Sequence, residues 1–93
     1  MLEKDIERRM AKMVKDRGGL CYKFTSPGSP GVPDRIVITP DGRVYFVELK
    51  TTIGSAQKIQ TWRMEEMRKR GAEVRLLKGL DAVKAFVEEV MPK

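Results

Sequence analysis

Residues 34–50 have the sequence DRIVITPDGRVYFVELK, and this stretch predicts a β-hairpin. Apolar residues fill the centre of each half, and the Pro40–Gly42 segment between the halves is a typical turn sequence. Because side chains alternate between the two faces of a strand, Glu48 and Lys50 should point to one face and Val47 to the other. The expected antiparallel strands cover residues 34–39 and 43–50.

Apolar residues at three- and four-residue spacing predict a helix on each side of the hairpin and another near the end of the chain. Gly18 and Gly71 follow the first two periodic segments directly and suit the positions where helices end. A short apolar or alternating segment after each of these glycines predicts a further strand. The expected helices cover residues 2–17, 56–70 and 81–91, and the additional strands cover 20–25 and 73–77.

The expected order of elements is therefore α-β-β-β-α-β-α. Three strands that follow one another locally suit antiparallel pairing, whereas the β-α-β portion suits a parallel pair with a right-handed crossover. We expect an α/β fold in which residues 1–93 form one domain, a mixed β-sheet flanked by helices, because this length leaves no room for a second domain. The expected inward-facing residues are Ile59, Trp62, Arg63 and Met67 on the second helix, and Val83, Val87 and Val90 on the third.

The composition excludes several kinds of site. The chain has no histidine, which removes Ser-His-Asp and Cys-His catalysis and Cys₂His₂ zinc sites. Cys21 is the only cysteine, so no intrachain disulfide can form, and the expected location is a reducing cytoplasm, bacterial or of a virus-infected host cell. No apolar run could cross a membrane, and the charged first residues are unlike a signal peptide. The net charge of +6 favours a polyanionic partner, such as a nucleic acid.

A loop rich in proline and glycine directly precedes the hairpin. Residues 26–33, SPGSPGVP, contain three prolines and two glycines, and they end next to Asp34. Hairpin pairing should bring Asp34 beside Glu48 and Lys50, so that two carboxylates and an amine meet. The carboxylates supply the hard oxygen ligands that Mg²⁺ prefers, and the carbonyl of Leu49 can add a neutral one. Lys50 can orient an attacking water, or help to deprotonate it, and can stabilise charge on a phosphate.

An ordinary surface is the alternative interpretation of these residues. A glutamate and a lysine two positions apart on a strand are commonly a solvated face in a chain with this many charges. Of the two Pro-Asp pairs, Pro40-Asp41 is explained by the hairpin turn, whereas Pro33-Asp34 is required by no turn that the sequence predicts.

Three parts of the sequence together resemble one known family. Gly31–Arg35 (GVPDR), Glu48–Thr51 (ELKT) and Gln60 on a helix that ends at Gly71 are similar to the virus-type replication–repair nuclease (VRR-NUC) domain of the PD-(D/E)xK superfamily. The resemblance extends from the first helix to about Val74. It implies a restriction-endonuclease-like αβββαβα fold. It also implies hydrolysis of phosphodiester bonds with Mg²⁺ or Mn²⁺ and without an organic cofactor.

The resemblance also implies roles for individual residues. Glu7 matches the acidic residue that completes the metal site from the first helix, although it can also be a helix-start charge favoured by the helix dipole. Gln60 matches a glutamine on the helix after the catalytic strand, with Gln57 as the competing assignment and an ordinary surface position as the alternative. The expected catalytic residues are Asp34, Glu48, Lys50 and Gln60, and the expected metal ligands are Glu7, Asp34, Glu48 and the carbonyl of Leu49.

Basic residues near these positions are candidate contacts to phosphate, and such contacts depend on salt rather than on base sequence. The sequence contains no recognisable sequence-reading motif, so we expect recognition of DNA shape. Small members of the family resemble Holliday-junction resolvases, which implies a homodimer on branched or junction DNA and no membrane partner. The alternatives are a nuclease of the same superfamily that acts on flaps or ends, and a basic nucleic-acid-binding module without catalysis. The expected nucleic-acid contacts are Arg8, Arg9, Lys12, Arg35 and Lys58.

Overall fold

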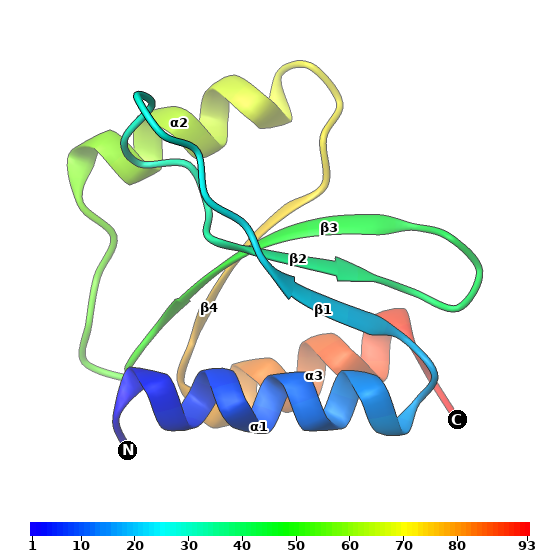
Figure 1. Ribbon diagram of the computed structural model, residues 1–93. Coiled ribbons are helices and arrows are strands. Elements are labelled where there is room, and N and C mark those ends of the chain that lie inside the picture. Colours follow the sequence, from blue (N-terminus) through cyan, green and yellow to red (C-terminus); the bar gives the residue numbers. More distant parts are fainter.

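The helices and strands follow one another in the expected order (Figure 1). A computed structural model describes all residues, 1–93. Each boundary lies within two residues of the prediction, and no helix is both long and apolar enough to cross a membrane. The elements are α1 (Glu3–Asp16), β1 (Leu20–Lys23), β2 (Arg35–Ile38), β3 (Val44–Lys50), α2 (Lys58–Arg68), β4 (Val74–Lys78) and α3 (Gly79–Val90).

The four strands form one mixed sheet in the order β1-β2-β3-β4. The β1–β2 and β2–β3 pairs are antiparallel, whereas β3 and β4 are parallel and are connected through α2. In the β2–β3 turn the N–H of Thr39 donates to the carbonyl of Arg43 at 2.9 Å. Gly42 completes the turn with φ at +89°, a left-handed conformation that favours glycine. The predicted hairpin and the mixed αβββαβα sheet are therefore confirmed.

The main core lies between the sheet and the pair α1 and α3, which pack side by side on one face (Figure 1). Because side chains alternate along a strand, every second residue of the central strands enters this core. The valines predicted to face inward from the last helix do so. The core consists of Ile6, Met10, Val14, Val37, Tyr45, Val47, Leu49, Leu77, Val83, Phe86, Val87, Val90 and Met91.

α2 lies on the other side of the sheet, next to the proline- and glycine-rich loop (Figure 1). The predicted buried face of this helix is wrong: Met64 is its buried residue, and Trp62 is 55% exposed. The loop rather than the sheet covers the neighbouring stripe of α2, since Arg63 Nε donates to the carbonyl of Pro30 at 3.2 Å. Gly31 packs so closely that an added Cβ would lie 2.7 Å from the carbonyl oxygen of Ile59. The loop and α2 therefore form one packed unit.

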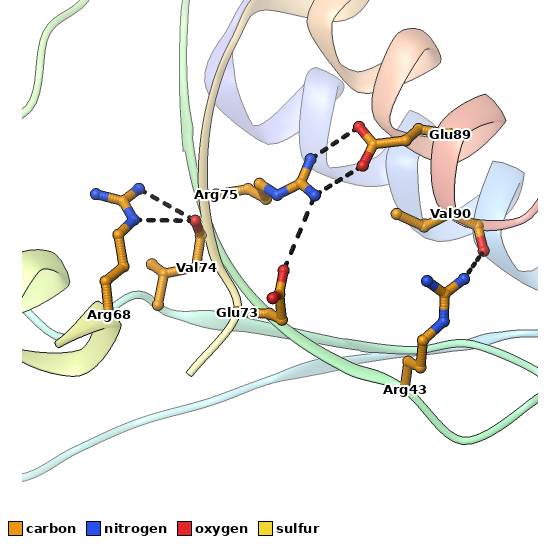
Figure 2. Close-up of polar contacts among 7 residues, drawn as sticks. All are labelled: Arg43, Arg68, Glu73, Val74, Arg75, Glu89 and Val90. Carbon is orange, nitrogen blue, oxygen red and sulfur yellow. Dashed lines mark hydrogen bonds and ion pairs between the residues drawn. The ribbon is translucent and has the colours of Figure 1, made fainter. Parts of the chain in front are cut away.

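Three arginines of the hairpin turn, α2 and β4 are engaged in contacts within the chain (Figure 2). Arg75 of β4 makes a two-pronged ion pair with Glu89 of α3, with N–O distances of 2.9 and 2.7 Å. Arg43 beside the hairpin turn donates to the carbonyl of Val90 at 2.9 Å, and Arg68 at the end of α2 donates to a carbonyl of β4. These cations connect helices to strands and are therefore part of the structure rather than a free basic surface.

Candidate active site

The hairpin register brings Asp34 and Glu48 together at one end of the sheet. Arg35 pairs with Val47, so Asp34, the residue before β2, lies opposite Glu48. Val47 belongs to the core beside α1 and α3, and Glu48 therefore points to the opposite face. Lys50, two residues further along β3, shares the face of Glu48. The meeting of two carboxylates and an amine that the sequence predicts is present in the structure.

Glu48 is the one buried acidic residue, with 6% of its surface exposed. Its Oε2 atom lies 3.6 Å from Nζ of Lys50 and accepts a hydrogen bond from Nε2 of Gln60 at 3.1 Å. Burial raises the pKa of Glu48 above its ordinary value, the negative charge of Asp34 raises it further, and Lys50 lowers it. A buried carboxylate beside a second carboxylate is an arrangement that a bound cation would stabilise.

Gln60 is held at both ends of its amide group. Its Oε1 atom accepts a hydrogen bond from the N–H of Gln57 at 2.9 Å, while its Nε2 donates to Glu48. Gln57 is the N-cap residue of α2, and the two glutamines form a reciprocal capping arrangement. Of the two glutamines that the sequence leaves open, Gln60 is therefore the one that contacts the site, and Gln57 begins the helix.

The side-chain partner of Glu7 is a basic residue outside the group of Glu48, Lys50 and Gln60, which differs from its predicted role. Its carboxylate forms an ion pair with Arg35, whose side chain points to the α1 face of the sheet, opposite to Glu48. No three Asp, Glu, Cys or His side chains are grouped closely enough to hold a metal ion between them. The sequence pattern cannot show which partner Glu7 has, because tertiary packing decides which turn of α1 lies next to the end of β3.

Glu3, one turn earlier on α1, is the acidic residue of this helix whose charge acts on Glu48, and it raises the pKa of that carboxyl. Eleven of the thirteen acidic residues form ion pairs within the chain; Glu3 and Asp81 do not. Glu3 was not among the predicted residues. The available signal was its spacing, since residues four apart lie on the same side of a helix.

The donor set fits a hard divalent cation bound by two carboxylates. Mg²⁺ commonly takes one or two carboxylates and completes its octahedral shell with water and substrate oxygens. Asp34, whose side chain is 53% exposed, and the enclosed Glu48 supply charged oxygens from adjacent strands. The carbonyl of Leu49 as a further ligand stays a prediction; its side chain lies in the core and fixes the backbone there.

The predicted nucleic-acid contacts differ in their surroundings. The side chain of Arg35 is only 5% exposed and is paired with Glu7, so this prediction does not agree with the structure. Arg9 and Lys58 are exposed and form no ion pair. Two further predicted contacts are exposed but paired along α1, Arg8 with Asp5 at 3.8 Å and Lys12 with Asp16 at 2.9 Å.

A cavity of about 490 Å³ lies beside the candidate site. Its wall includes Thr51 and Thr52, which directly follow Lys50, and Lys78 at the end of β4. Lys50 and Lys78 are partners in the parallel register, so two ammonium groups belong to the same edge of the sheet. Charged ligands of open α/β sheets commonly bind at the carboxyl ends of parallel strands.

Comparisons with known proteins agree with this architecture. No family model matches the chain. A solved structure described as a VRR_NUC domain is 31% identical, with a TM-score of 0.86 over 92% of this chain and 94% of that one. A second, described as a VRR_NUC domain protein, has a TM-score of 0.77 over 98% of this chain and 88% of that one; at 18% identity it supports the fold.

A curated protein, "Putative nuclease p44" of Acyrthosiphon pisum secondary endosymbiont phage 1, is 50% identical over 48 residues. That match spans 52% of this chain and only 52% of the phage protein. The similarity to the solved VRR_NUC domain is broader, because it extends over nearly the whole of both chains. On its αβββαβα topology, its grouped Asp34, Glu48 and Lys50, and this full-length similarity, the chain belongs to the VRR-NUC family of nuclease domains.

Proposed function

We propose that this chain is a Mg²⁺- or Mn²⁺-dependent endonuclease that hydrolyses phosphodiester bonds in branched DNA. The observation that supports it most is the enclosed Glu48 carboxylate, which lies opposite Asp34 and has Lys50 and Gln60 as its polar partners. The membership of a nuclease-domain family supports the same class of reaction.

Each residue of the site would have a distinct task. Asp34, Glu48 and the carbonyl of Leu49 would hold the ion; when bound, the ion activates a water and polarises the scissile phosphate. Lys50 would orient the attacking water and stabilise the charge that develops on the phosphate. Gln60 would fix the rotamer of Glu48 through its amide. Water attacks in line, and the family resemblance implies 5′-phosphate and 3′-hydroxyl products.

Glu3 is our candidate for the third acidic group. Glu7 forms an ion pair with Arg35. Glu3 has no ion-pair partner, and its negative charge raises the pKa of Glu48. Its role would be to complete the negative environment of the ion, through a bound water or directly. Glu3→Gln should therefore weaken cleavage of bound DNA, whereas Arg9→Gln on the same helix should weaken DNA binding and make it less dependent on salt, without slowing cleavage of bound DNA.

The test compares labelled four-way junction, flap and linear duplex, with Mg²⁺ and with EDTA, for the wild type and Lys50→Ala. We expect cleavage of the junction in Mg²⁺ only, and its loss in Lys50→Ala with binding retained. Preferred cutting of the flap would identify the flap-directed alternative. Equal binding in Mg²⁺ and EDTA without any cutting would contradict the enzyme and support a binding module.

We further propose that the chain acts as a homodimer through the part of the sheet that α2 leaves exposed on the face opposite α1 and α3, where Leu20, Tyr22 and Val44 are exposed. Two rows of side chains cross the first three strands on this face, and none of them is charged. A chain with a net charge of +6 repels a copy of itself, so an uncharged apolar surface is where two copies can approach. The rows are Leu20, Ile38 and Val44, and Tyr22, Ile36 and Phe46.

Sedimentation velocity at micromolar concentration tests the dimer. We expect a dimer for the wild type and a monomer for Val44→Lys, which introduces a charge at a 43% exposed position. Thr61→Lys, an exposed position on α2, is the control and should remain dimeric. A monomeric wild type that still cuts the junction would exclude this assembly.

A further inference from the structure

Arg35 is an unusual cation in this chain. Among its 32 charged residues only Arg35 and Glu48 are buried, and they point to opposite faces of the sheet. A buried cation is tolerated only where it is paired and hydrogen-bonded, since its desolvation is costly. Its contacts therefore show what it stabilises.

The guanidinium of Arg35 connects α1 to the residue that precedes β2. It forms an ion pair with Glu7, and NH1 donates to the backbone carbonyl of Asp34 at 2.8 Å. NH1 also lies 3.9 Å from the carboxylate of Asp34. The same carbonyl of Asp34 accepts the N–H of Phe24 at 2.8 Å, which extends the β1–β2 pairing.

These contacts are the ones that fix the position of Asp34. Its carboxylate is half-exposed and makes no other ion pair, and the residue before it, Pro33, has no N–H to donate. The exit of a loop with three prolines and two glycines is thus held by two hydrogen bonds to one carbonyl. One of the two donors is the guanidinium of Arg35, which is itself paired with Glu7 of α1.

We infer that Arg35 is a positioning residue for Asp34, and that Glu7 is the counter-ion of Arg35 rather than a metal ligand. The inference rests on the proposed metal-dependent function in one respect: Asp34 is taken as a ligand. Arg35 cannot itself be a phosphate contact, because its side chain is buried on the opposite face. A lysine could not replace it, since one ammonium cannot supply the two parallel donor directions of a guanidinium.

Two measurements on the DNA-free protein test this inference. The first is amide hydrogen exchange in EDTA for the wild type, Arg35→Lys and Glu7→Gln. We expect at least tenfold faster exchange at the N–H of Phe24 in both variants, with unchanged exchange in the β2–β3 pair. Unchanged exchange at Phe24 would overturn the inference whether or not the protein binds a metal.

The second measurement is calorimetric titration with Mn²⁺. Residues that orient a ligand typically change metal affinity by about 10- to 100-fold, so Arg35→Lys and Glu7→Gln should each weaken binding about tenfold. The double variant should be no weaker than either single one, because both act through the same contact. A larger loss in Glu7→Gln than in Arg35→Lys, with additive effects, would identify Glu7 as a ligand and overturn the inference.

Arg75→Lys and Glu89→Gln are matched controls, since they disturb an ion pair between the same sheet and α3. Both should leave Mn²⁺ affinity and exchange at Phe24 unchanged. A wild type that binds no Mn²⁺ would refute the proposed metal-dependent function alone, because the exchange experiment still decides the role of Arg35. Lower thermal stability without any change at Phe24 would mean that Arg35 is merely structural.

Discussion

The two ends of the β2–β3 hairpin differ in how far their charged side chains are compensated by partners of opposite charge. Towards the turn, the guanidinium groups of Arg43 and of Arg75 from β4 both lie over the ring of Tyr45, and they are matched by a carbonyl and by a carboxylate (Figure 2). At the other end, Asp34 and Glu48 lie opposite each other with Lys50 as the nearby cation. The turn end is electrostatically satisfied and the loop end is not. Unfavourable like charges that persist in a folded protein commonly mark a functional site.

The largest expected effect is the loss of cleavage at the loop end. Asp34→Ala and Glu48→Ala should each lower the rate of Mg²⁺-dependent junction cutting by at least about a hundredfold, because each would remove a charged ligand of the ion. Arg43→Ala at the turn end should retain the wild-type rate. Single-turnover cleavage of a labelled junction measures all three, and Glu48→Ala at the wild-type rate would show that the site is assigned wrongly.

The carboxylate of Glu48 should make the metal-free protein less stable as pH rises. Because burial and Asp34 raise the pKa of Glu48, the folded state binds this proton more tightly than the unfolded chain. The free energy of unfolding should therefore decrease from about pH 4.3, the ordinary glutamate value, up to the raised pKa, by about 1.4 kcal/mol for each pH unit that separates the two.

Urea denaturation in EDTA across this pH range measures that dependence. Glu48→Gln should flatten the curve and be more stable than the wild type near neutral pH, and the advantage should vanish in acid. Asp34→Asn should lower the pKa of Glu48 and therefore narrow the pH range over which the stability falls. A wild type whose stability rises with pH in step with Glu48→Gln would contradict the raised pKa.

The turn end should instead contribute stability without activity. Arg75 lies 5.5 Å from the ring centre of Tyr45 and 5.6 Å from that of Phe86. Arg75→Ala should lower the free energy of unfolding by about 1 kcal/mol, mainly through these cation–π contacts, since an exposed ion pair adds little. The rate of DNA cleavage by the folded variant should be unchanged. A reduced rate would show that the Arg75 contacts influence the candidate site and would contradict this prediction.

The smallest expected effect is a change in the reactivity of the Cys21 thiol, whose pKa depends on burial, Arg35 and Glu7. Burial raises the pKa of this thiol, Arg35 lowers it and Glu7 raises it. Glu7→Gln should therefore lower the pKa and increase the rate of reaction with a disulfide reagent about two- to fivefold at pH 7.5, because the thiolate is the reacting form. The control Glu89→Gln should have no effect, and slower reaction in Glu7→Gln would contradict the electrostatic assignment.

The parts of the site that depend on local patterns could be predicted from the sequence. Strand alternation and a turn of known type are sufficient to place Asp34 opposite Glu48, with Lys50 on the same face as Glu48. Parts that depend on how a helix is rotated against the sheet could not. Glu7 and Glu3 lie one turn apart on α1, so periodicity alone cannot tell which of them approaches Glu48.

α2 shows the same limit in another form. Its inward face was predicted from apolar spacing, but a loop covers part of the helix and leaves Trp62 exposed. The choice between Gln57 and Gln60 was likewise open, because both lie in the first turn and only the contact with Glu48 separates them. Tertiary packing decides such positions, and a single sequence does not contain the partner surface.

The close packing of Gly31 against Ile59 has a consequence for substrate entry. The loop that leads to Asp34 and the helix that bears Gln60 are interlocked, while Glu48 and Lys50 belong to the sheet. The site is thus assembled from two packed units, which the chain connects at four places, 24–25, 33–34, 51–57 and 69–73. Because Gln60 belongs to one unit and Glu48 to the other, any movement of α2 away from the sheet that admitted a nucleic acid strand would also break their hydrogen bond and free the Glu48 side chain.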